Sequence, residues 1–214
     1  MSAIKLFWSD PYLTELEASV TGVDGNTVTL DRTVAYAFSG GQQSDSGTIG
    51  GFQILDARMD GKEIYYTIEP GHTLTRGQDV KVAIDWAKRY RLMRLHFAAE
   101  IILELVYQRF GHPQKVGANI TEDKARVDFV WDGKISDIFP SLLDEANRLI
   151  AADLPIISAY EDEDNEERYW QIDGFAKVPC GGTHLKRTGE VGAISLKRNN
   201  IGSGKERIEI YLRP

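Results

Sequence analysis

Apolar and polar residues alternate over short stretches in the first part of the chain, up to about Asp85. Two pairs of these stretches flank tight-turn sequences, Asp24-Gly25-Asn26 and Asp60-Gly61, as expected for β-hairpins. Several short strands at close spacing predict a small β-barrel. The predicted strands are Val20–Val23, Thr27–Leu30, Phe52–Ala57, Glu63–Ile68 and Val80–Ile84.

The pattern changes after Asp85. Residues Trp86–Phe110 carry apolar side chains at a period close to about 3.6, and Gly111 follows as a stop signal, so we predict a long helix. A second helix is expected from about Pro140 to Ala152, with Pro140 at its first position. Further strands are expected at Arg126–Trp131, Pro155–Ala159, Ala193–Leu196 and Arg207–Leu212.

This mixture predicts an α+β fold in which helices pack on one face of a mainly antiparallel sheet. The change of pattern also predicts two domains, a β-barrel over residues 1–87 and a two-layer α/β domain over residues 88–214.

The composition is that of an ordinary soluble globular protein, with 42% hydrophobic and 27% charged residues among 214. No apolar stretch approaches the roughly 20 residues of a membrane span, and the N-terminus has no apolar signal core. A single cysteine, Cys180, excludes an internal disulfide. We therefore expect a cytoplasmic protein with no membrane partner.

The net charge of -7 is unevenly spread along the chain. An acidic run over residues 161–167 is expected to be a solvated loop. Residues 180–214 instead hold seven basic side chains against three acidic ones. A local basic surface of this kind can bind RNA even when the total charge is negative.

Two pairs of residues suggest a metal site. His96 lies on the first predicted helix and Glu100 one turn further on, so both side chains share one helix face. Cys180 and His184 have the same spacing, but Gly181 and Gly182 between them favour a loop. One thiolate, two imidazoles and one carboxylate form a suitable shell for Zn²⁺. Each residue type alone is common at ordinary positions, and the prediction depends on their combination.

The segment Val178-Pro179-Cys180-Gly181-Gly182-Thr183-His184 is followed closely by Thr188-Gly189-Glu190-Val191-Gly192. In these motifs the chain resembles the editing domain of alanyl-tRNA synthetase and its free-standing relatives, the AlaX proteins. The resemblance covers nearly the whole chain, in the family's order. The other matching segments are Leu30-Asp31-Arg32-Thr33, Gly40-Gly41-Gln42-Gln43-Ser44-Asp45-Ser46-Gly47, Arg94-Leu95-His96, Arg126-Val127-Asp128-Phe129 and Glu145-Ala146-Asn147.

This resemblance implies a glycine-rich β-barrel domain followed by an editing domain with one zinc ion. The implied ligands are His96, Glu100, Cys180 and His184. It further implies a trans-editing esterase that deacylates alanine tRNA mischarged with serine, or with glycine. No segment resembles the ATP-using synthetase core, so no use of ATP is expected.

The resemblance also assigns residues to the substrate. It places Thr33 near the serine hydroxyl, gives Gln42 polar contacts in the pocket, and leaves Glu100 either as fourth ligand or as an acid–base group. The chain departs from the family at Glu100, where a second histidine is usual, and at Ser39, where a third glycine is usual. Because serine tolerates positive φ poorly, the second change is expected to alter the loop backbone.

The expected partner is mischarged tRNA, bound along a basic rim near the metal motifs. The predicted rim residues are Arg94, Lys186, Arg187, Lys197, Arg198 and Lys205. Two alternatives stay open at this stage. One is editing of a different aminoacyl-tRNA, and the other is a tRNA-binding module whose metal is structural or absent.

Overall fold

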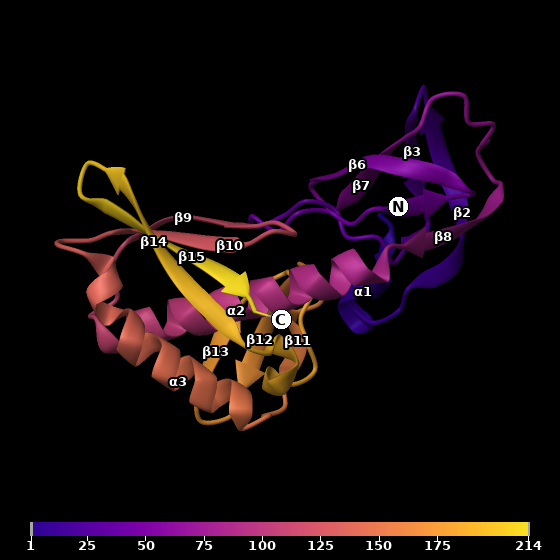
Figure 1. The fold of residues 1–214 in the computed structure, drawn as a ribbon. Helices are drawn as coiled ribbons and strands as arrows, with labels where there is room; N and C mark the ends of the chain where they lie inside the picture. Colours follow the sequence, from indigo (N-terminus) through magenta and orange to yellow (C-terminus); the bar gives the residue numbers. More distant parts are fainter. Residues whose placement is uncertain (1, 214) are drawn as a thin grey trace. The chain divides into compact units, whose positions relative to one another are not determined.

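The computed structural model of the chain describes residues 2–213, which form two compact units (Figure 1). The first unit comprises the residues up to Ser39 together with Gln43–Tyr90. The second unit comprises Gly40–Gln42 together with the residues from Arg91 onward. The division falls close to the 87/88 boundary suggested by the sequence. It also assigns Gly40–Gln42, the start of the glycine-rich segment at residues 40–47, to the second unit.

Unit 1 is built on a closed β-barrel whose strands pair antiparallel in the order β2-β3-β7-β6-β5-β8. Gly25 and Gly61 stand at positive φ in two of its hairpin turns, at 56° and 57°, where a Cβ would strain the backbone. The barrel strands are β2 (Glu15–Asp24), β3 (Thr27–Leu30), β5 (Gly47–Ile49), β6 (Phe52–Asp60), β7 (Glu63–Ile68) and β8 (Asp79–Ile84). The short elements outside the barrel are β1 (Ile4–Lys5), α1 (Leu6–Ser9) and β4 (Arg32–Thr33).

A buried ion pair ties the loops of unit 1 together. The guanidinium of Arg89, which is 0% exposed, contacts both carboxylate oxygens of Asp45. Arg89 also donates to the carbonyl oxygens of Pro11 and Val34, at 3.0 and 2.6 Å, and Asp45 accepts from the Tyr36 amide at 2.7 Å. The pair thus ties Asp45, inside the glycine-rich segment, to Val34 and Tyr36 before it. Removing either charged partner would leave the other charge buried and unpaired.

Thr33 lies fully buried beside Tyr66 on β7. The Tyr66 hydroxyl donates to the carbonyl of Ala35 at 2.7 Å, so it accepts from the Thr33 hydroxyl, 2.8 Å away. The Thr33 oxygen in turn accepts from the Ala35 amide at 3.0 Å. Burial raises the pKa of Tyr66, which keeps the phenol protonated as this arrangement requires. The Thr33 hydroxyl is therefore engaged inside unit 1.

Unit 2 contains two antiparallel sheets and two helices (Figure 1). The four-stranded sheet has the order β14-β15-β10-β9, and the three-stranded sheet has the order β11-β12-β13. The helices are α2 (Trp86–Arg109), whose first residues belong to unit 1, and α3 (Phe139–Ala151). The strands are β9 (Lys115–Ile120), β10 (Ala125–Val130), β11 (Ile157–Asp162), β12 (Glu167–Ile172), β13 (Ala176–Pro179), β14 (Ile194–Gly202) and β15 (Lys205–Leu212), with 3-10 turns η1 (Ile135–Ile138) and η2 (Thr188–Val191).

Within unit 2, helix α2 is buried on more than one side. Its Phe97 packs edge-on against Trp170 of β12, and its Tyr107 packs against Phe129 of β10, with ring centroids 5.2 and 6.4 Å apart. The helix therefore contacts both sheets, which explains why nearly every residue from Leu92 to Val106 is buried or half-buried. The prediction of one sheet with helices on one face is corrected on this point, because β11, β12 and β13 form a second sheet.

The mixed α+β class and the two long helices are confirmed. The acidic run is not wholly a loop, since Glu161 and Asp162 end β11, Glu167 begins β12, and only the residues between them form the turn. None of the helices among residues 2–213 combines the length and apolar composition that a membrane span requires.

We expect Thr33→Val to lower the free energy of unfolding by roughly 1–2 kcal/mol, because it leaves the buried Tyr66 oxygen without a donor. Urea unfolding of the full chain measures this change. Thr29→Val is the control, because the Thr29 hydroxyl bonds Thr21 at an exposed position and its loss should cost about 0.5 kcal/mol or less. Equal losses in the two variants would contradict the buried role of Thr33.

Candidate metal centre

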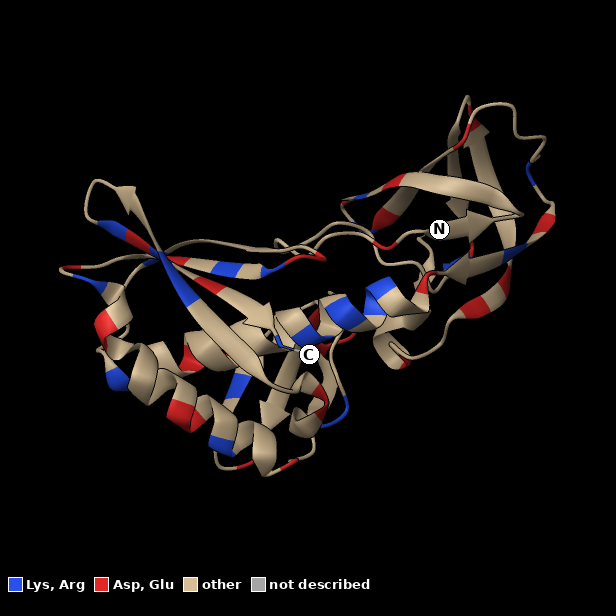
Figure 2. Ribbon diagram, viewed as in Figure 1, with Lys and Arg blue, Asp and Glu red and all other residues tan. Residues whose placement is uncertain are grey.

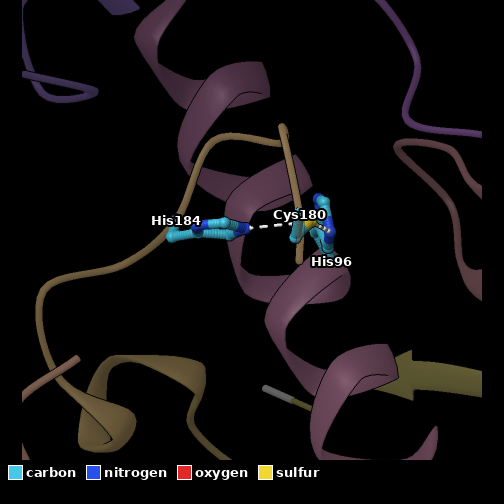
Figure 3. Close-up of side chains that lie close together, drawn as sticks. All are labelled: His96, Cys180 and His184. Atoms are coloured by element: carbon cyan, nitrogen blue, oxygen red, sulfur yellow. Dashed lines mark hydrogen bonds between the residues drawn. The ribbon is translucent and has the colours of Figure 1, made fainter. Parts of the chain in front are cut away.

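Three potential metal ligands converge in unit 2, and Figure 3 shows them together. His96 projects from α2, Cys180 follows directly after β13, and His184 lies on the loop beyond it. The Cys180 Sγ lies 3.4 Å from His96 Nε2 and 3.3 Å from His184 Nε2. All three ligand atoms lie within 4.8 Å of one another. The structure thus brings together the predicted cysteine and both predicted histidines.

Glu100 joins this cluster from the next turn of α2. Its Oε1 lies 3.1 Å from His96 Nε2 and 3.6 Å from Cys180 Sγ. Both distances are similar to the 3.4 Å between His96 Nε2 and Cys180 Sγ. The spacing of four residues on one helix face produces this convergence.

A buried amide holds the His96 ring. Gln42, which is 1% exposed, accepts from the backbone amide of Thr183 with its Oε1 at 3.2 Å and donates with its Nε2 to the Thr183 hydroxyl at 2.8 Å. The same Oε1 lies 2.5 Å from His96 Nδ1. Because this oxygen is an acceptor, His96 Nδ1 carries a proton and Nε2 faces Cys180. A metal ligand is commonly oriented in this way through its second nitrogen.

Gln42 reaches this position because its segment runs along the edge of β9. The Ile120 amide donates to the Gly41 carbonyl at 2.8 Å, and Gln42 forms a bridge with Ile120. A Cβ at Gly41, whose φ is 86°, would lie 2.7 Å from the carbonyl oxygen of Ala118. Gly40 and Gly41 have positive φ and Ser39 does not, so the serine is spared the conformation that it tolerates poorly.

Gly182 explains part of the Gly-Gly sequence between Cys180 and His184. A Cβ at this position would lie 2.0 Å from His96 Cε1 and 2.9 Å from Gln42 Oε1. Only a residue without a side chain allows the loop to pass the imidazole this closely. The loop that carries Cys180 therefore also packs directly against the His96 ring.

His184 is held from the other side of the cluster. Its Nδ1 lies 3.0 Å from the hydroxyl of Ser158 on β11, which leaves Nε2 toward Cys180. Its ring packs edge-on against His96 and Phe97, with centroids 5.3 and 6.0 Å away. Both imidazoles thus present the same nitrogen to the sulfur.

The charges of the cluster are coupled. Burial alone would lower the pKa of His96. The neighbouring Cys180 and Glu100 outweigh this effect and raise that pKa to about 10. Burial, reinforced by the charge of His96, lowers the pKa of His184 to about 3. Burial raises the pKa of Glu100, but His96, His184 and Trp170 outweigh it and hold that pKa below its usual range. One imidazolium therefore neutralises part of the negative charge, and a divalent cation could replace its proton.

Two further predicted site residues are not metal ligands. Thr33 belongs to unit 1, and Gln42 lies in unit 2, buried against the His96 ring. Lys197 and Arg198 are neighbours on β14 and so point to opposite faces of the sheet. Arg198 pairs with Glu206, and Figure 2 shows Lys and Arg spread over several elements rather than along one edge.

The remaining rim residues lie around the loop after His184 and at the last hairpin. Arg94 donates to the Val191 carbonyl at 3.0 Å, and Arg187 pairs with Asp153 at 2.7 Å. Lys186 precedes Arg187, and Lys205 begins β15. The six residues thus come from α2, the loop after His184, β14 and the start of β15, and their joint role as a rim stays a prediction.

Sequence reasoning missed the residues that orient the ligands. Thr183 is inside the recognised motif, so its contact with Gln42 could have been suspected from its position. Ser158 and Trp170 have no such signal, because a serine and a tryptophan on strands carry no spacing that relates them to a distant helix.

The chain is similar to known proteins over the region that contains the cluster. Residues 168–209 match the family model described as the threonyl and alanyl tRNA synthetase second additional domain. The chain is 32% identical over 212 residues to the alanyl-tRNA editing protein AlaX-M of Pyrococcus horikoshii, covering 97% of each chain. It is 33% identical to the AlaX-M protein of Methanosarcina barkeri, covering 97% of this chain and 98% of that one. The alanine–tRNA ligase of Ignicoccus hospitalis is 32% identical, and the match covers 96% of this chain but 25% of the ligase.

We expect Gly182→Ala to weaken metal binding roughly ten- to hundred-fold, because the added methyl displaces the His96 ring. Competition with a chelator measures the affinity. Gly117→Ala is the matched control in the same unit, since its added Cβ would make only an ordinary contact with Asp128, at 3.4 Å. Unchanged metal affinity in the Gly182 variant would show that the orientation of His96 does not limit binding.

Proposed function

The chain belongs to the AlaX-M family of alanyl-tRNA editing proteins, and on this premise we propose that it is a zinc-dependent aminoacyl-tRNA deacylase. The single observation that carries the proposal is the cluster of His96, Cys180 and His184 inside the matched region and its neighbouring helix. The substrate proposed is alanine tRNA mischarged with serine or glycine, and the reaction needs no ATP. The protein would act in the cytoplasm, where mischarged tRNA is found.

The donor set supports zinc. In a tetrahedral site with Zn–S of about 2.3 Å and Zn–N of about 2.1 Å, the sulfur and nitrogen atoms lie roughly 3.6 Å apart. The two sulfur–nitrogen distances here are 3.4 and 3.3 Å, so a small expansion accommodates the ion. A thiolate with imidazoles favours zinc over the hard cations calcium and magnesium.

The reaction is addition of water to the ester. The water oxygen bonds to the carbonyl carbon, the bond from that carbon to the ribose oxygen breaks, and a proton passes to the ribose oxygen. Bound zinc would supply Lewis acidity toward the carbonyl oxygen or the water. His96, Cys180 and His184 would hold the ion, Gln42 and Ser158 would fix the two imidazoles, and Glu100 would serve as fourth ligand.

Substrate choice rests on the family resemblance. Thr33→Val tests the role that the resemblance gives to Thr33, because selection of serine through its hydroxyl predicts a roughly five- to thirty-fold fall in the ratio of seryl to alanyl cleavage. An unchanged ratio assigns the hydroxyl to the contact with Tyr66 alone. Because the matched family model is named for both threonyl and alanyl synthetases, a panel of charged tRNAs is the appropriate assay.

We expect Cys180→Ala to lower the zinc content and abolish seryl-tRNA deacylation together, because the sulfur contacts both imidazoles. Zinc analysis and deacylation are measured on the same preparation, and melting temperature reports the fold. Full metal content with full activity in this variant would refute the site. Retained RNA binding by a parent protein without ester cleavage would instead indicate a binding module with a structural metal.

Glu100 gives a second test of the same centre. We expect Glu100→His to retain zinc and deacylate as fast as the parent or faster, because a neutral ligand leaves the metal a stronger Lewis acid. Glu100→Ala should loosen the metal. If Glu100→Ala binds zinc as tightly as the parent, the carboxylate is not a ligand, and loss of activity in that variant would make it an acid–base group.

A further inference from the structure

The four-stranded sheet of unit 2 has an apolar face and a polar face. On the apolar face, Phe129 of β10 packs against Tyr107 of α2, and Val127 stands opposite Ile208 of β15. Because side chains alternate along a strand, the residues between these belong to the other face. The strand register sets them in rows, one with Gly117, Asp128, Arg207 and Asn199, and the next with Asn119, Arg126, Glu209 and Lys197.

The polar face is cationic although the whole chain has a net charge of -7. Its cations outnumber its carboxylates by five to two, and they come from β14, β15 and the start of β10 (Figure 2). The cations are Lys124, Arg126, Lys197, Lys205 and Arg207, and the carboxylates are Asp128 and Glu209. The face thus has an excess of positive charge that the rest of the chain lacks.

The two carboxylates lie beneath the cations. The side chains of Asp128 and Glu209 are 7% and 5% exposed, whereas those of Arg126 and Arg207 are 30% and 22% exposed. Lys197 and Lys205 are exposed as well. A molecule that approaches this face therefore meets the positive groups first.

Ion pairs hold part of this cationic layer in place. Arg126 and Arg207 both contact the Asp128 carboxylate, and the Arg207 Nε lies 2.7 Å from Asp128 Oδ1. Lys124 pairs with Glu209 at 2.5 Å. Because the side chains are ordered before a ligand binds, less conformational entropy is lost on binding.

The chemistry of the face suits a phosphate backbone better than a protein partner or a single strand. The centre of a protein interface is usually apolar and aromatic, and this face offers Asn and Ser between its charges. Single-stranded RNA is usually held by stacking on aromatic rings. Among the described residues of these strands, Tyr211 is the one aromatic side chain on this face, and its hydroxyl donates to Glu209 at 2.9 Å.

The turns at the ends of the strands limit where RNA can lie. Glu122 and Asp123 lie in the turn between β9 and β10, and Asp132 follows the other end of β10. These exposed carboxylates would repel phosphates. The favourable area is therefore the middle of the face and its β14–β15 side, which carries Lys197 and Lys205.

We propose that this cationic sheet face binds the phosphate backbone of the base-paired part of a tRNA. The inference rests on the proposed function, because it takes tRNA as the partner. Double-stranded RNA is recognised mainly through its shape, its phosphates and its 2′-hydroxyls, so the face would bind without reading base sequence. Lys197 and Lys205, two of the residues predicted to form a basic rim, would act here together with Arg126 and Arg207.

The test measures binding of full-length protein to a fluorescein-labelled RNA hairpin by anisotropy. The hairpin has a stem of acceptor-helix length, a blunt end and no unpaired 3′ nucleotides, so it reports on the helical part alone. We expect Lys197→Glu to weaken binding roughly three- to thirty-fold. Lys197→Ala and Lys205→Ala should each lower the slope of log affinity against log salt by about one, as loss of one phosphate contact predicts.

Arg148→Glu is the matched control, because it makes the same change in net charge at an exposed cation of unit 2. Arg148 lies on α3, its side chain is 76% exposed, and α3 packs through its buried face. This variant should bind the hairpin within about twofold of the parent. Equal weakening in Lys197→Glu and Arg148→Glu, or no binding of the hairpin by the parent, overturns the proposal.

Two further outcomes separate the partner and the function. A polyglutamate peptide of the same charge should compete poorly with the hairpin, and competition as strong as that of unlabelled hairpin would indicate an acidic protein as the partner instead. Deacylation of mischarged tRNA together with hairpin binding that does not depend on Lys197 would keep the proposed function and remove the face. Hairpin binding that depends on Lys197 in a protein that cleaves no ester would do the reverse.

Discussion

The candidate centre depends on one buried contact, the amide of Gln42 against the His96 ring. This amide joins three segments that are far apart in the sequence, namely the glycine-rich segment, helix α2 and the loop after Cys180. Each of its hydrogen bonds constrains the next, because the Thr183 bonds fix which atom of Gln42 is the acceptor, and that atom fixes the protonated nitrogen of His96. A buried network of this kind specifies a single geometry when every member is satisfied.

Helix α2 makes such a network possible because it is covered on both sides within unit 2. If the face of α2 that carries His96 and Glu100 were exposed to solvent, the imidazole and the carboxylate would interact only weakly. Contact of Phe97 with Trp170 instead closes the side of the helix that carries the cluster. The same burial explains why the two histidines diverge in pKa, since only one positive charge is stable among Cys180 and Glu100.

The sequence predicted much of this arrangement and missed a definable part. Periodicity located both long helices, and the i,i+4 spacing together with the only cysteine pointed to His96, Cys180 and His184, whose ligand atoms converge in the structure. It could not place Gln42, whose position follows from a backbone bridge to Ile120, nor reveal a second sheet, because strand pairing is a long-range property. The basic rim stays a prediction, and it would use only one of Lys197 and Arg198 on a given face of the sheet, because adjacent strand residues face opposite ways.

The carboxylate of Glu100 changes the formal charge of the proposed zinc centre. With zinc, a thiolate and a carboxylate give a formally neutral centre, whereas a third imidazole in place of Glu100 would leave one positive charge. Neutrality weakens attraction for the developing negative charge of an ester oxygen. The buried Arg168 guanidinium stacks over Tyr160 and lies close enough to Cys180 and His184 to interact electrostatically with both. In the proposed zinc centre, a cation on the neighbouring strand β12 thus offsets part of the positive charge that the carboxylate removes, which makes Glu100 compatible with the proposed hydrolysis.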